Sequence, residues 1–420
     1  MKVAVIGSGG REHSLVWKIA QSPKVTKVYA LPGNAGIAEL AACVPIKADD
    51  ISGVVDFCKK EGIGLVVIGP EAPLSKGLAD TLKQHKIPAV GPDSKAARLE
   101  SSKVWAKDFM VRHGIPTAKY KNVSSSAELL KAVDEFGLPV VIKMDGLFAG
   151  KGVFICKDMT EVKSAAEAVY GSVSGETVVV EEFLKGEEAS YMVFSDGESY
   201  IPLETSRDHK RIYDGEKGPN TGGMGAVSPA PISKDVEETV KSFVIEPLLK
   251  GMREENLKYN GIIYAGVMIL PDGRIRVLEF NARLGDPETQ SILFRMESDI
   301  MDILLPLGKD RRLPKNYTVK WSPMTACCVV MAEQGYPGDY VTGAEIPALA
   351  SGKVSYAKGE FVFHAGTASR DGKFIVNGGR VLGVTALGNG LDDARKKAYA
   401  LVEKIAWPSS YYRKDIGVWN

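Results

Sequence analysis

The first hundred residues alternate short apolar segments with glycine-containing turns and amphipathic segments. The apolar segments 2–6 and 65–68 predict buried strands, and the segments 13–21 and 53–62 predict helices. Strands that alternate with helices indicate a parallel sheet with helices on both faces. We therefore expect a doubly wound α/β domain over residues 1–100.

Gly10, Arg11 and Glu71 follow the carboxyl ends of two of these predicted strands, where open α/β sheets bind ligands. The glycine turn before Arg11 is similar to a dinucleotide fingerprint. However, Glu12 stands where a third glycine is needed, and no acid closes the second strand at Ala30. The pattern favours a small phosphate bound by backbone N–H groups at a helix N-terminus over NAD.

The remaining three quarters of the chain change in pattern, first to mixed helices and strands and finally to a small α+β domain. A further helix at 76–85 is predicted within the first hundred residues, and the later predicted helices lie at 95–113, 126–136, 159–170, 235–257, 297–307 and 391–406. The predicted strands lie at 139–143, 153–156, 177–184, 262–270, 274–281, 323–332, 361–366 and 373–386.

A loop rich in glycine and lysine runs from Met144 to Gly152, directly after Lys143 at the end of a predicted strand. Glycines let the backbone approach phosphate oxygens closely, and lysines supply positive charge. The loop is not a Walker loop, because Gly152 follows Lys151 where a hydroxyl residue is required. Taken alone, the loop is also compatible with a flexible hairpin that carries surface lysines.

The predicted strand 274–281 ends in polar residues. Because strand side chains alternate with period two, Glu279, Asn281 and Arg283 are expected to project on one side before the turn at Asp286. Carboxylate and amide oxygens suit Mg²⁺, which takes one or two protein ligands plus substrate phosphates, and arginine suits a phosphoryl group. A single Glu-x-Asn is more often an ordinary strand edge, so the hypothesis gains weight only from the other segments.

Two further segments suggest ligand contacts. The charged segment 207–211 precedes the glycine-rich segment 218–225, and loops of this kind often bind ligands, although each residue alone is compatible with a solvated loop. Arg380 follows two glycines inside a predicted strand, which indicates a bulge or a close approach to a ligand, with a surface arginine as the equal alternative.

Composition narrows the function classes. With 53 Lys+Arg against 52 Asp+Glu, no overall charge points to nucleic acid or an anionic membrane. The longest apolar segment, 262–270, is shorter than the about 20 residues that a membrane helix needs. We expect no signal peptide, and the 5 cysteines without a C-x-x-C pair predict the reducing cytoplasm. The 5 histidines show no zinc spacing, and Cys327 and Cys328 are expected in the core.

Ten segments in order resemble the glycinamide ribonucleotide synthetase family (phosphoribosylamine–glycine ligases) of the ATP-grasp superfamily. They are GSGGREH, GPEAPL, KMDGLFAGKGV, VEEFLKGEEAS, DHKR, GPNTGGMGA, EFNARLGDPETQ, FHAGT, NGGRVLGVTA and YYRKDIG. The resemblance spans essentially the whole chain and implies an α/β and α+β multidomain fold. The implied parts are an N-terminal substrate-binding domain at 1–100, an ATP-grasp central domain at 101–120 and 188–322, a lid subdomain at 121–187 and a C-terminal domain at 323–420.

The resemblance also implies the reaction. ATP, glycine and 5-phosphoribosylamine would give ADP, phosphate and glycinamide ribonucleotide through a glycyl phosphate, a step of de novo purine biosynthesis. It implies Mg²⁺ or Mn²⁺ as cofactor and ATP as co-substrate. The enzyme would be a cytoplasmic monomer that acts on small molecules and contacts neither nucleic acid nor membrane.

The family pattern carries site residues onto this chain by position. The residues implied at ATP are Lys103, Lys143, Ala149, Gly150, Lys151, Gly152, Glu181, Leu184 and Glu188, with Glu181 and the Leu184 backbone at adenine and Glu188 at the ribose. The implied metal ligands are Glu279 and Asn281, and the implied catalytic residues are Arg283, Lys143 and Asp286. The implied substrate-binding residues are Gly10, Arg11, Glu71, Asp208, Asp286 and Arg380.

Some positions depart from the family pattern. Met144, Phe148 and Leu284 replace residues common in the family, and the segment before Glu176 is short. The neighbouring strand 265–270 has no acid, so a metal ion would depend more on phosphate oxygens.

Two rival hypotheses remain. One is another ATP-grasp ligase, similar to biotin carboxylase or D-alanine ligase, against which GSGGREH and NGGRVLG argue. The other is a non-catalytic nucleotide-binding protein, which loss of Lys143, Glu279 or Asn281 would favour; all three residues are present.

Overall fold

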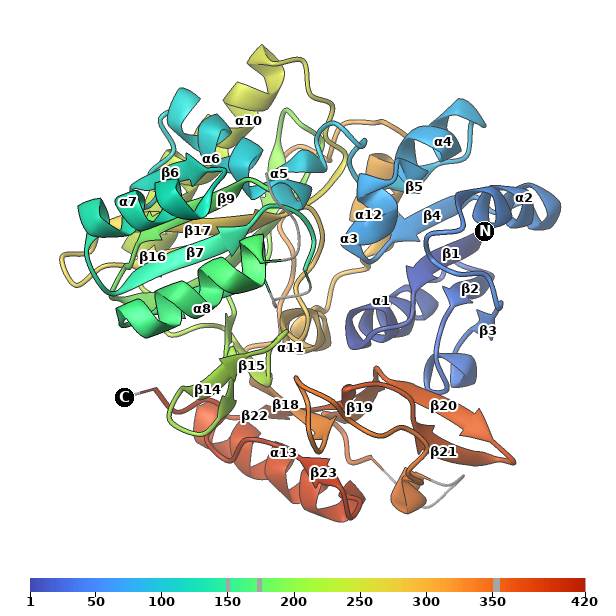
Figure 1. Cartoon of the computed structure of the whole chain (residues 1–420). Helices are drawn as coiled ribbons and strands as arrows, with labels where there is room; N and C mark the ends of the chain where they lie inside the picture. The colour runs from blue at the N-terminus through green and yellow to red at the C-terminus, as the bar shows by residue number, and fades with distance from the viewer. Residues whose placement is uncertain (149–151, 172–175, 350–355, 420) are drawn as a thin grey trace.

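The computed structural model describes residues 1–148, 152–171, 176–349 and 356–419. Figure 1 shows the N-terminal strands on one side, the sheets of the middle segment on the other, and the C-terminal sheet below both. Helix α11 (Glu288–Arg295) lies at the centre of this arrangement. The predicted site residues Ala149, Gly150 and Lys151 lie outside the described residues.

The N-terminal sheet has the doubly wound architecture predicted from the sequence. Its strands are all parallel, in the order β3-β2-β1-β4-β5. The strands are β1 (Lys2–Gly7), β2 (Lys27–Pro32), β3 (Ala42–Cys43), β4 (Leu65–Ile68) and β5 (Ala89–Val90), and the helices are α1 (Gly10–Ala20), α2 (Ile51–Glu61), α3 (Glu71–Ser75) and α4 (Leu78–Gln84). Strand order reverses between β1 and β4, which makes the ends of these two strands the switch point at which such sheets bind ligands.

Helix α1 begins three residues earlier than predicted. Gly9 is its N-cap, so Gly10 and Arg11 lie in the first turn rather than in a loop. The helix α3, which was not predicted, begins at Glu71 directly after β4. Both candidate segments of this domain therefore occupy helix N-termini at the switch point.

Part of the N-terminal sheet is covered by a helix from much later in the chain. Helix α12 (Met301–Gly308) packs Ile303, Leu304 and Leu307 into the same core as Val5 and Leu65. Each fully buried apolar side chain of this size contributes about 1.5–3 kcal/mol. The predicted helix 297–307 thus begins later than expected, and α11, which precedes it, was not predicted at all.

A separate four-stranded antiparallel sheet follows, in the order β6-β9-β7-β8, covered by two helices. Its elements are β6 (Tyr120–Val123), α7 (Ser126–Phe136), β7 (Val140–Met144), β8 (Val153–Cys156), α8 (Met159–Tyr170) and β9 (Val178–Glu182). Both helices match their predicted bounds. Each has a side-chain N-cap: Ser125 accepts from the Glu128 N–H, and Asp158 accepts from the Thr160 and Glu161 N–H groups.

The central sheet has the order β11-β10-β16-β17 and is antiparallel. Its strands are β10 (Glu187–Ser195), β11 (Tyr200–Pro202), β16 (Gly261–Ile269) and β17 (Ile275–Asn281), and the helices around it are α5 (Arg98–Ser101), α6 (Lys103–Arg112), α9 (Lys234–Val240) and α10 (Glu246–Glu254). The predicted helix 235–257 is interrupted by a π-helical turn at Lys241–Ile245.

The C-terminal sheet has the order β12-β15-β18-β22-β19 and includes two strands from the middle of the chain. Its strands are β12 (Arg207–Asp208), β15 (Gly225–Ser228), β18 (Thr325–Glu333), β19 (Glu360–His364), β22 (Arg380–Gly388) and β23 (Ser410–Tyr411), and α13 (Leu391–Ile405) packs on it. Cys327 and Cys328 are buried in it, as expected.

The predicted single strand 373–386 is wrong. It is two strands, β21 (Lys373–Val376), which forms a hairpin with β20 (Thr367–Arg370), and β22. The break occurs at Gly378, which lies against Gly366 so closely that a Cβ on Gly366 would meet the Gly378 Cα at 2.6 Å.

Within the described residues, no helix is long and apolar enough to cross a membrane.

The N-terminal and C-terminal sheets meet at two buried histidines. The ring Nδ1 of His13, on α1, accepts a hydrogen bond from the His364 N–H at 2.7 Å. Phe361 and Phe363 pack edge-on against the His13 ring. Burial lowers the pKa of His13 well below its ordinary value and lowers the pKa of His364 from 6.5 to about 4. Both imidazoles are therefore neutral in the folded protein at neutral pH.

This contact predicts acid-sensitive stability. The folded pKa of His364 lies below its unfolded value, so its contribution is present above about pH 6.5 and is lost as pH falls toward about 4, with about 3 kcal/mol at most for one such group. In His364→Asn the fall in unfolding temperature between about pH 7 and about pH 5 should be smaller than in the parent protein. The control is His85→Asn at the exposed C-cap position of α4. An unchanged pH slope in His364→Asn would contradict the assignment.

Candidate functional site

A bulge in β17 directs the polar residues at its end. Val277 pairs with Val267 but Glu279 pairs with Gly266, so one extra residue interrupts the register. Strict alternation would put Val277 and Glu279 on the same face. Instead Val277 and Phe280 share the core, and Glu279 and Asn281 lie on the other face.

The carbonyl groups at the bulge accept hydrogen bonds from side chains. Lys143 Nζ, at the end of β7, donates to the Leu278 carbonyl at 2.9 Å. Thr117 Oγ1 donates to the Val277 carbonyl at 2.7 Å. The bulge therefore fixes Lys143 close to the strand that carries Glu279.

Glu181, at the end of β9, lies between two lysines. Its carboxylate is 3.0 Å from Lys143 Nζ and 3.0 Å from Lys107 Nζ. The side chains of Lys107 and Glu181 are 3% and 2% exposed, so these charges are removed from water. Burial lowers the pKa of Lys107 to about 8, although Glu181 favours its charged form. In the structure the Glu181 carboxylate therefore forms ion pairs with both Lys107 and Lys143.

Further positive charges surround Glu279. Lys103 is the first residue of α6 and donates to the Gly146 carbonyl at 2.7 Å. Burial lowers the pKa of Lys103, partly offset by Glu279. Burial would raise the pKa of Glu279, but the cations around it lower the pKa below its ordinary value: Lys210, Lys143, Lys103 and Arg283. An excess of cations around one carboxylate suits a polyphosphate.

Arg283 joins the end of β17 to the N-terminal domain. Its guanidinium Nε is 3.2 Å from Glu71, and its Nη2 is 2.8 Å from Glu100 and 3.2 Å from Asn281 Oδ1. Burial would raise the pKa of Glu71, but Arg283 and Arg11 lower it to about 2. Burial would also lower the pKa of Arg283, but Glu100 and Glu71 raise it above its ordinary value. The Arg283 guanidinium is therefore held charged and in a fixed orientation beside Asn281.

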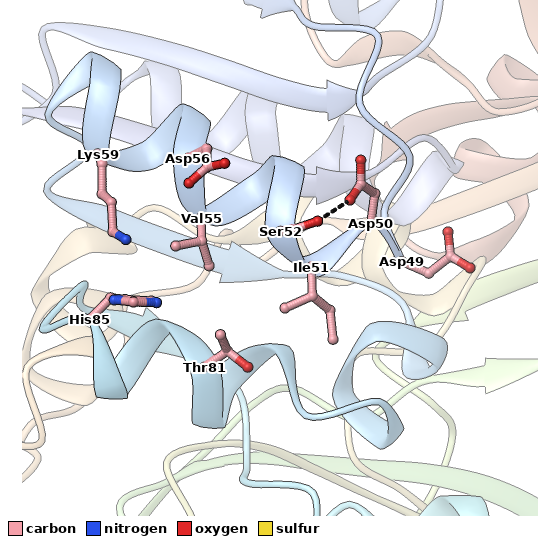
Figure 2. Close-up of a pocket in the computed structure, with 9 residues that line it drawn as sticks. All are labelled: Asp49, Asp50, Ile51, Ser52, Val55, Asp56, Lys59, Thr81 and His85. Carbon is pink, nitrogen blue, oxygen red and sulfur yellow. Dashed lines mark hydrogen bonds between the residues drawn. The ribbon is translucent and has the colours of Figure 1, made fainter.

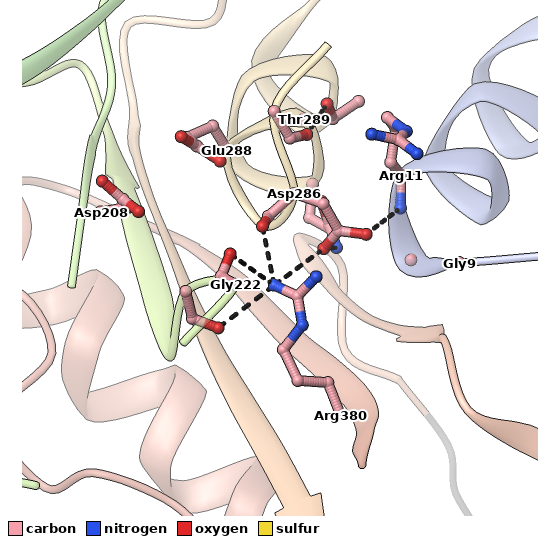
Figure 3. Close-up of polar contacts among 12 residues, drawn as sticks. Gly9, Arg11, Asp208, Gly222, Asp286, Glu288, Thr289 and Arg380 are labelled. Atoms are coloured by element: carbon pink, nitrogen blue, oxygen red, sulfur yellow. Dashed lines mark hydrogen bonds and ion pairs between the residues drawn. The ribbon is translucent and has the colours of Figure 1, made fainter. Parts of the chain in front are cut away.

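Asp286 joins all three parts of the chain (Figure 3). Its Oδ2 accepts from the Arg11 N–H at 3.1 Å, in the first turn of α1. Arg380 Nη1, from the C-terminal sheet, donates to the Asp286 carbonyl at 2.7 Å and to the Gly222 carbonyl at 2.8 Å. Burial would raise the pKa of Asp286, but Arg380 and Arg11 lower it. The predicted substrate residues Arg11, Asp286 and Arg380 do come together.

A second pair of carboxylates faces the same region. Asp208, on β12, is 3.0 Å from Lys210 Nζ, and Glu288 Oε1, on α11, accepts from Tyr264 OH at 2.7 Å. Burial and then Asp208 raise the pKa of Glu288, which places the two carboxyl groups within electrostatic range. Figure 3 shows Asp208 and Glu288 on the same side of the turn that carries Asp286.

The remaining predicted ATP residues lie on β9 and β10. Leu184 is half-buried just after β9, and Glu188 is exposed on β10 opposite Met268. The Gly152 carbonyl accepts from the Met144 N–H at 2.8 Å, at the base of the glycine-rich loop.

Elsewhere, a hollow of about 530 Å³ lies between α2 and α4 (Figure 2) and contains none of the predicted site residues.

Sequence reasoning missed four residues of this site. Lys107 and Glu100 lie on or beside helices, where a single charged residue is normally solvated, so no local signal separates them from surface residues. Lys210 and Glu288 lie within the segments DHKR and EFNARLGDPETQ, but the sequence pattern assigns them no role. Burial of Lys107, Glu100 and Glu288 and the pairing of Lys210 with Asp208 result from tertiary packing.

Sequence models of one family match most of the chain. The phosphoribosylglycinamide synthetase N domain matches residues 1–100, the ATP-grasp (A) domain matches 101–289, and the C domain matches 326–419. A phosphoribosylamine–glycine ligase of Escherichia coli is 48% identical over 99% of this chain and 98% of its own length. That of Pseudomonas aeruginosa is 46% identical over 99% and 97%.

The chain belongs to the phosphoribosylglycinamide synthetase family.

Solved structures agree with this membership. The crystal structure of phosphoribosylamine–glycine ligase from Thermotoga maritima superimposes with a TM-score of 0.85 at 34% identity, over 99% of this chain and 100% of that one. The biotin carboxylase domain of 2-oxoglutarate carboxylase from Hydrogenobacter thermophilus has a TM-score of 0.75 at 17% identity, over 98% and 91%. That second likeness shows the ATP-grasp fold alone, and the hypothesis of a biotin-carboxylase-like ligase loses its support.

The position of Glu181 between two lysines predicts a structural effect. Glu181→Gln leaves Lys107 and Lys143 without a carboxylate, and breaking a buried ion pair typically costs about 3–5 kcal/mol. Denaturant unfolding of the variant should show a loss of that order. The matched control is Glu182→Gln, which keeps an oxygen acceptor for the Lys119 N–H. Unchanged stability with a raised KM for ATP would instead assign Glu181 to adenine alone.

Proposed function

We propose that this chain joins glycine to 5-phosphoribosylamine at the expense of ATP, giving glycinamide ribonucleotide, ADP and phosphate in purine biosynthesis. Full-length similarity to phosphoribosylamine–glycine ligases supports the substrates. The single structural observation that carries the proposal is the cluster of Lys103, Lys143 and Arg283 around Glu279 at the turn where the three parts of the chain meet. That cluster supplies charge where a phosphoryl group would be transferred.

The chemistry follows from the substrates. A carboxylate is a poor electrophile, so one oxygen of glycine's carboxylate attacks the γ-phosphorus of ATP, which gives glycyl phosphate and ADP. The amine of phosphoribosylamine then attacks the activated carbonyl, phosphate leaves, and the amine loses a proton. Phosphoryl transfer needs positioning and charge neutralisation, and we propose Lys143 and Arg283 for these roles.

The oxygen donors at the end of β17 fit a divalent metal ion. ATP-grasp ligases use ATP with a divalent metal, and we propose Mg²⁺ or Mn²⁺ held by Glu279 and Asn281. Among the described residues, no three His, Cys, Asp or Glu side chains are grouped to hold a metal. Two protein ligands therefore suit an ion that takes its remaining ligands from phosphate and water. Such an ion neutralises phosphate charge during transfer.

For the nucleotide, we propose that Lys103 and Lys143 bind the phosphates and that the Leu184 backbone and Glu188 contact adenine and ribose. The glycine-rich loop with Ala149, Gly150, Lys151 and Gly152 would cover the phosphates, as the lid subdomain 121–187 closes. The contacts of Glu181 support a further duty, which is to hold Lys143 in place from the side of the lid sheet.

For phosphoribosylamine, the proposed residues are Gly10, Arg11, Glu71, Asp286 and Arg380. The Arg11 N–H is already donated to Asp286, and the Gly9 N–H is donated to Glu12. Within the described residues, Nε and Nη2 of Arg380 donate no hydrogen bond, whereas Nη1 donates three. This supports guanidinium groups, more than the backbone of α1, as the donors to the substrate phosphate.

For glycine, we propose that its ammonium group lies between Asp208 and Glu288 while its carboxylate points toward Arg283. The charge of the two neighbouring carboxyl groups is offset only by the ammonium group of Lys210, so a second cation would balance it.

We also propose that the enzyme is a cytoplasmic monomer. Its cysteines are all free, and four of the five are buried, which suits a reducing compartment.

Phosphate release from ATP tests the function directly. Release should require glycine and phosphoribosylamine together and should be slow with either alone, because glycyl phosphate is retained until the amine attacks. Release that depends on bicarbonate, or that ignores glycine, would contradict the proposal. The product can be identified by its mass.

Loss of the metal ligand provides a second test. Glu279→Gln keeps the shape of the side chain but removes a metal-binding charge, so kcat should fall by about a hundredfold or more, as for loss of a major electrostatic contribution. Because the surrounding cations lower the pKa of Glu279, its charge stabilises the fold, and Glu279→Gln should also lower the free energy of unfolding. Turnover that stays unchanged at every Mg²⁺ concentration would overturn the metal assignment.

Asp208→Asn tests the glycine position. Removing one carboxylate from the proposed ammonium site should raise the KM for glycine by roughly tenfold or more, in line with about 1.5–3 kcal/mol for a charged hydrogen bond. The KM for ATP should change little. A rise confined to the KM for phosphoribosylamine would instead assign Asp208 to the binding of that substrate.

A further inference from the structure

The C-terminal segment Tyr411–Gly417 has no part in the function proposed so far, although it contains the largest fully buried side chain of the described chain, Arg413. Arg413 Nε and Nη2 pair with Asp415 at 2.7 and 2.8 Å. Its Nη2 is also 2.7 Å from Glu216, and its Nη1 donates to the Arg211 carbonyl at 3.0 Å. The segment is therefore attached to the hairpin formed by β13 (Arg211–Tyr213) and β14 (Lys217–Asn220).

His209 connects this network to the site. Its Nε2 accepts from the Gly417 N–H at 2.9 Å, which leaves Nδ1 as the ring nitrogen that donates. That Nδ1–H donates to Glu216 Oε1 at 2.6 Å. Trp419 stacks on the ring at a centroid distance of 5.2 Å and an angle of 9°. With one donor and one acceptor both satisfied, the ring of His209 has a fixed orientation.

The backbone of His209 is fixed as firmly as its ring. Its N–H donates to the Gly225 carbonyl at 2.9 Å, and its carbonyl accepts from the Met224 N–H at 2.8 Å. The flanking residues, Asp208 and Lys210, form an ion pair with each other at 3.0 Å, so their side chains lie on one side of the chain. In an extended backbone the intervening His209 points to the opposite side, where the C-terminal segment lies.

We propose that the C-terminal segment positions Asp208 and Lys210 for substrate, with His209 and Glu216 as the positioning residues. The inference rests on the proposed placement of glycine at Asp208. Arg413 and Gly417 hold Glu216 and His209 from one side, and the peptide on either side of His209 presents the two charged groups to Glu288 from the other. The last residues of the chain thereby act on one substrate without touching it.

Glu216→Ala is the informative variant, because Glu216 is half-exposed and its removal opens no internal cavity. The variant removes the acceptor of the His209 Nδ1–H and one of the two carboxylate partners of Arg413 Nη2. The KM for glycine should rise by about tenfold, as expected for loss of a charged hydrogen bond, while the KM for ATP stays within about twofold. Glu216→Gln should restore most of the glycine affinity, because its Oε1 can still accept.

Lys217→Ala is the matched control, one residue along and exposed on β14, and it should leave all KM values unchanged. A second readout does not depend on activity. Hydrogen exchange of the His209 and Met224 N–H groups should be faster in Glu216→Ala than in the control, because the ring no longer anchors this backbone.

The outcomes separate this inference from the function beneath it. If Asp208→Asn raises the KM for glycine but Glu216→Ala does not, the positioning role is overturned and the glycine site stands. If Glu216→Ala raises the KM values for ATP and glycine equally, the network is only structural, and the inference is also overturned. If Asp208→Asn leaves the KM for glycine unchanged, the proposed position of glycine is wrong, and the positioning role is overturned with it.

Discussion

Paired charges at the turn after β17 are the interaction on which the rest of the structure depends. Arg283 contacts Glu71 and Glu100, and Asp286 contacts Arg11 and Arg380. Removing such groups from water is expensive, and each is stable here only because a partner and further hydrogen bonds offset that cost. The partners come from helices α1 and α3 of the N-terminal domain, from α5 and from the C-terminal sheet. The same contacts that orient the reactive groups therefore fix the positions of the three parts of the chain relative to one another.

Much of the fold could be predicted because its signals are local. The bounds of β4, β8, α7 and α8 follow from apolar periodicity and, for the two helices, from N-caps that are visible as Ser125 and Asp158. Helix α11 could not be predicted in this way, since it buries Glu288, Thr289, Gln290 and Ser291 and so lacks an apolar face in the sequence. The break at Gly378 depends on contact with Gly366, a partner that local pattern does not reveal.

The candidate site shows the same division. Sequence motifs predict Lys143, Glu279 and Asn281, and Lys143 does lie close to the strand that carries the other two, but period-two alternation does not explain their positions. Period-two alternation from Val277 would have put Glu279 into the core, and only the bulge opposite Gly266 turns it outward. Lys107 and Glu100 carry no local signal because burial, which gives them their role, is a property of the packed molecule. The assigned ligands of these residues remain predictions.

The pairing of β12 and β15 with β18 and the packing of α12 on the N-terminal sheet have a consequence for synthesis on the ribosome. The N-terminal sheet is complete in its strands after about ninety residues, yet the apolar surface that α12 covers stays open until residue 308 has emerged. Likewise β15 has no neighbour on one edge until β18 is made, about a hundred residues later. Contacts of such long sequence separation form slowly, and exposed edges and apolar faces promote aggregation meanwhile. Nascent chains of this protein therefore depend on protection from association until about four fifths of the sequence is available.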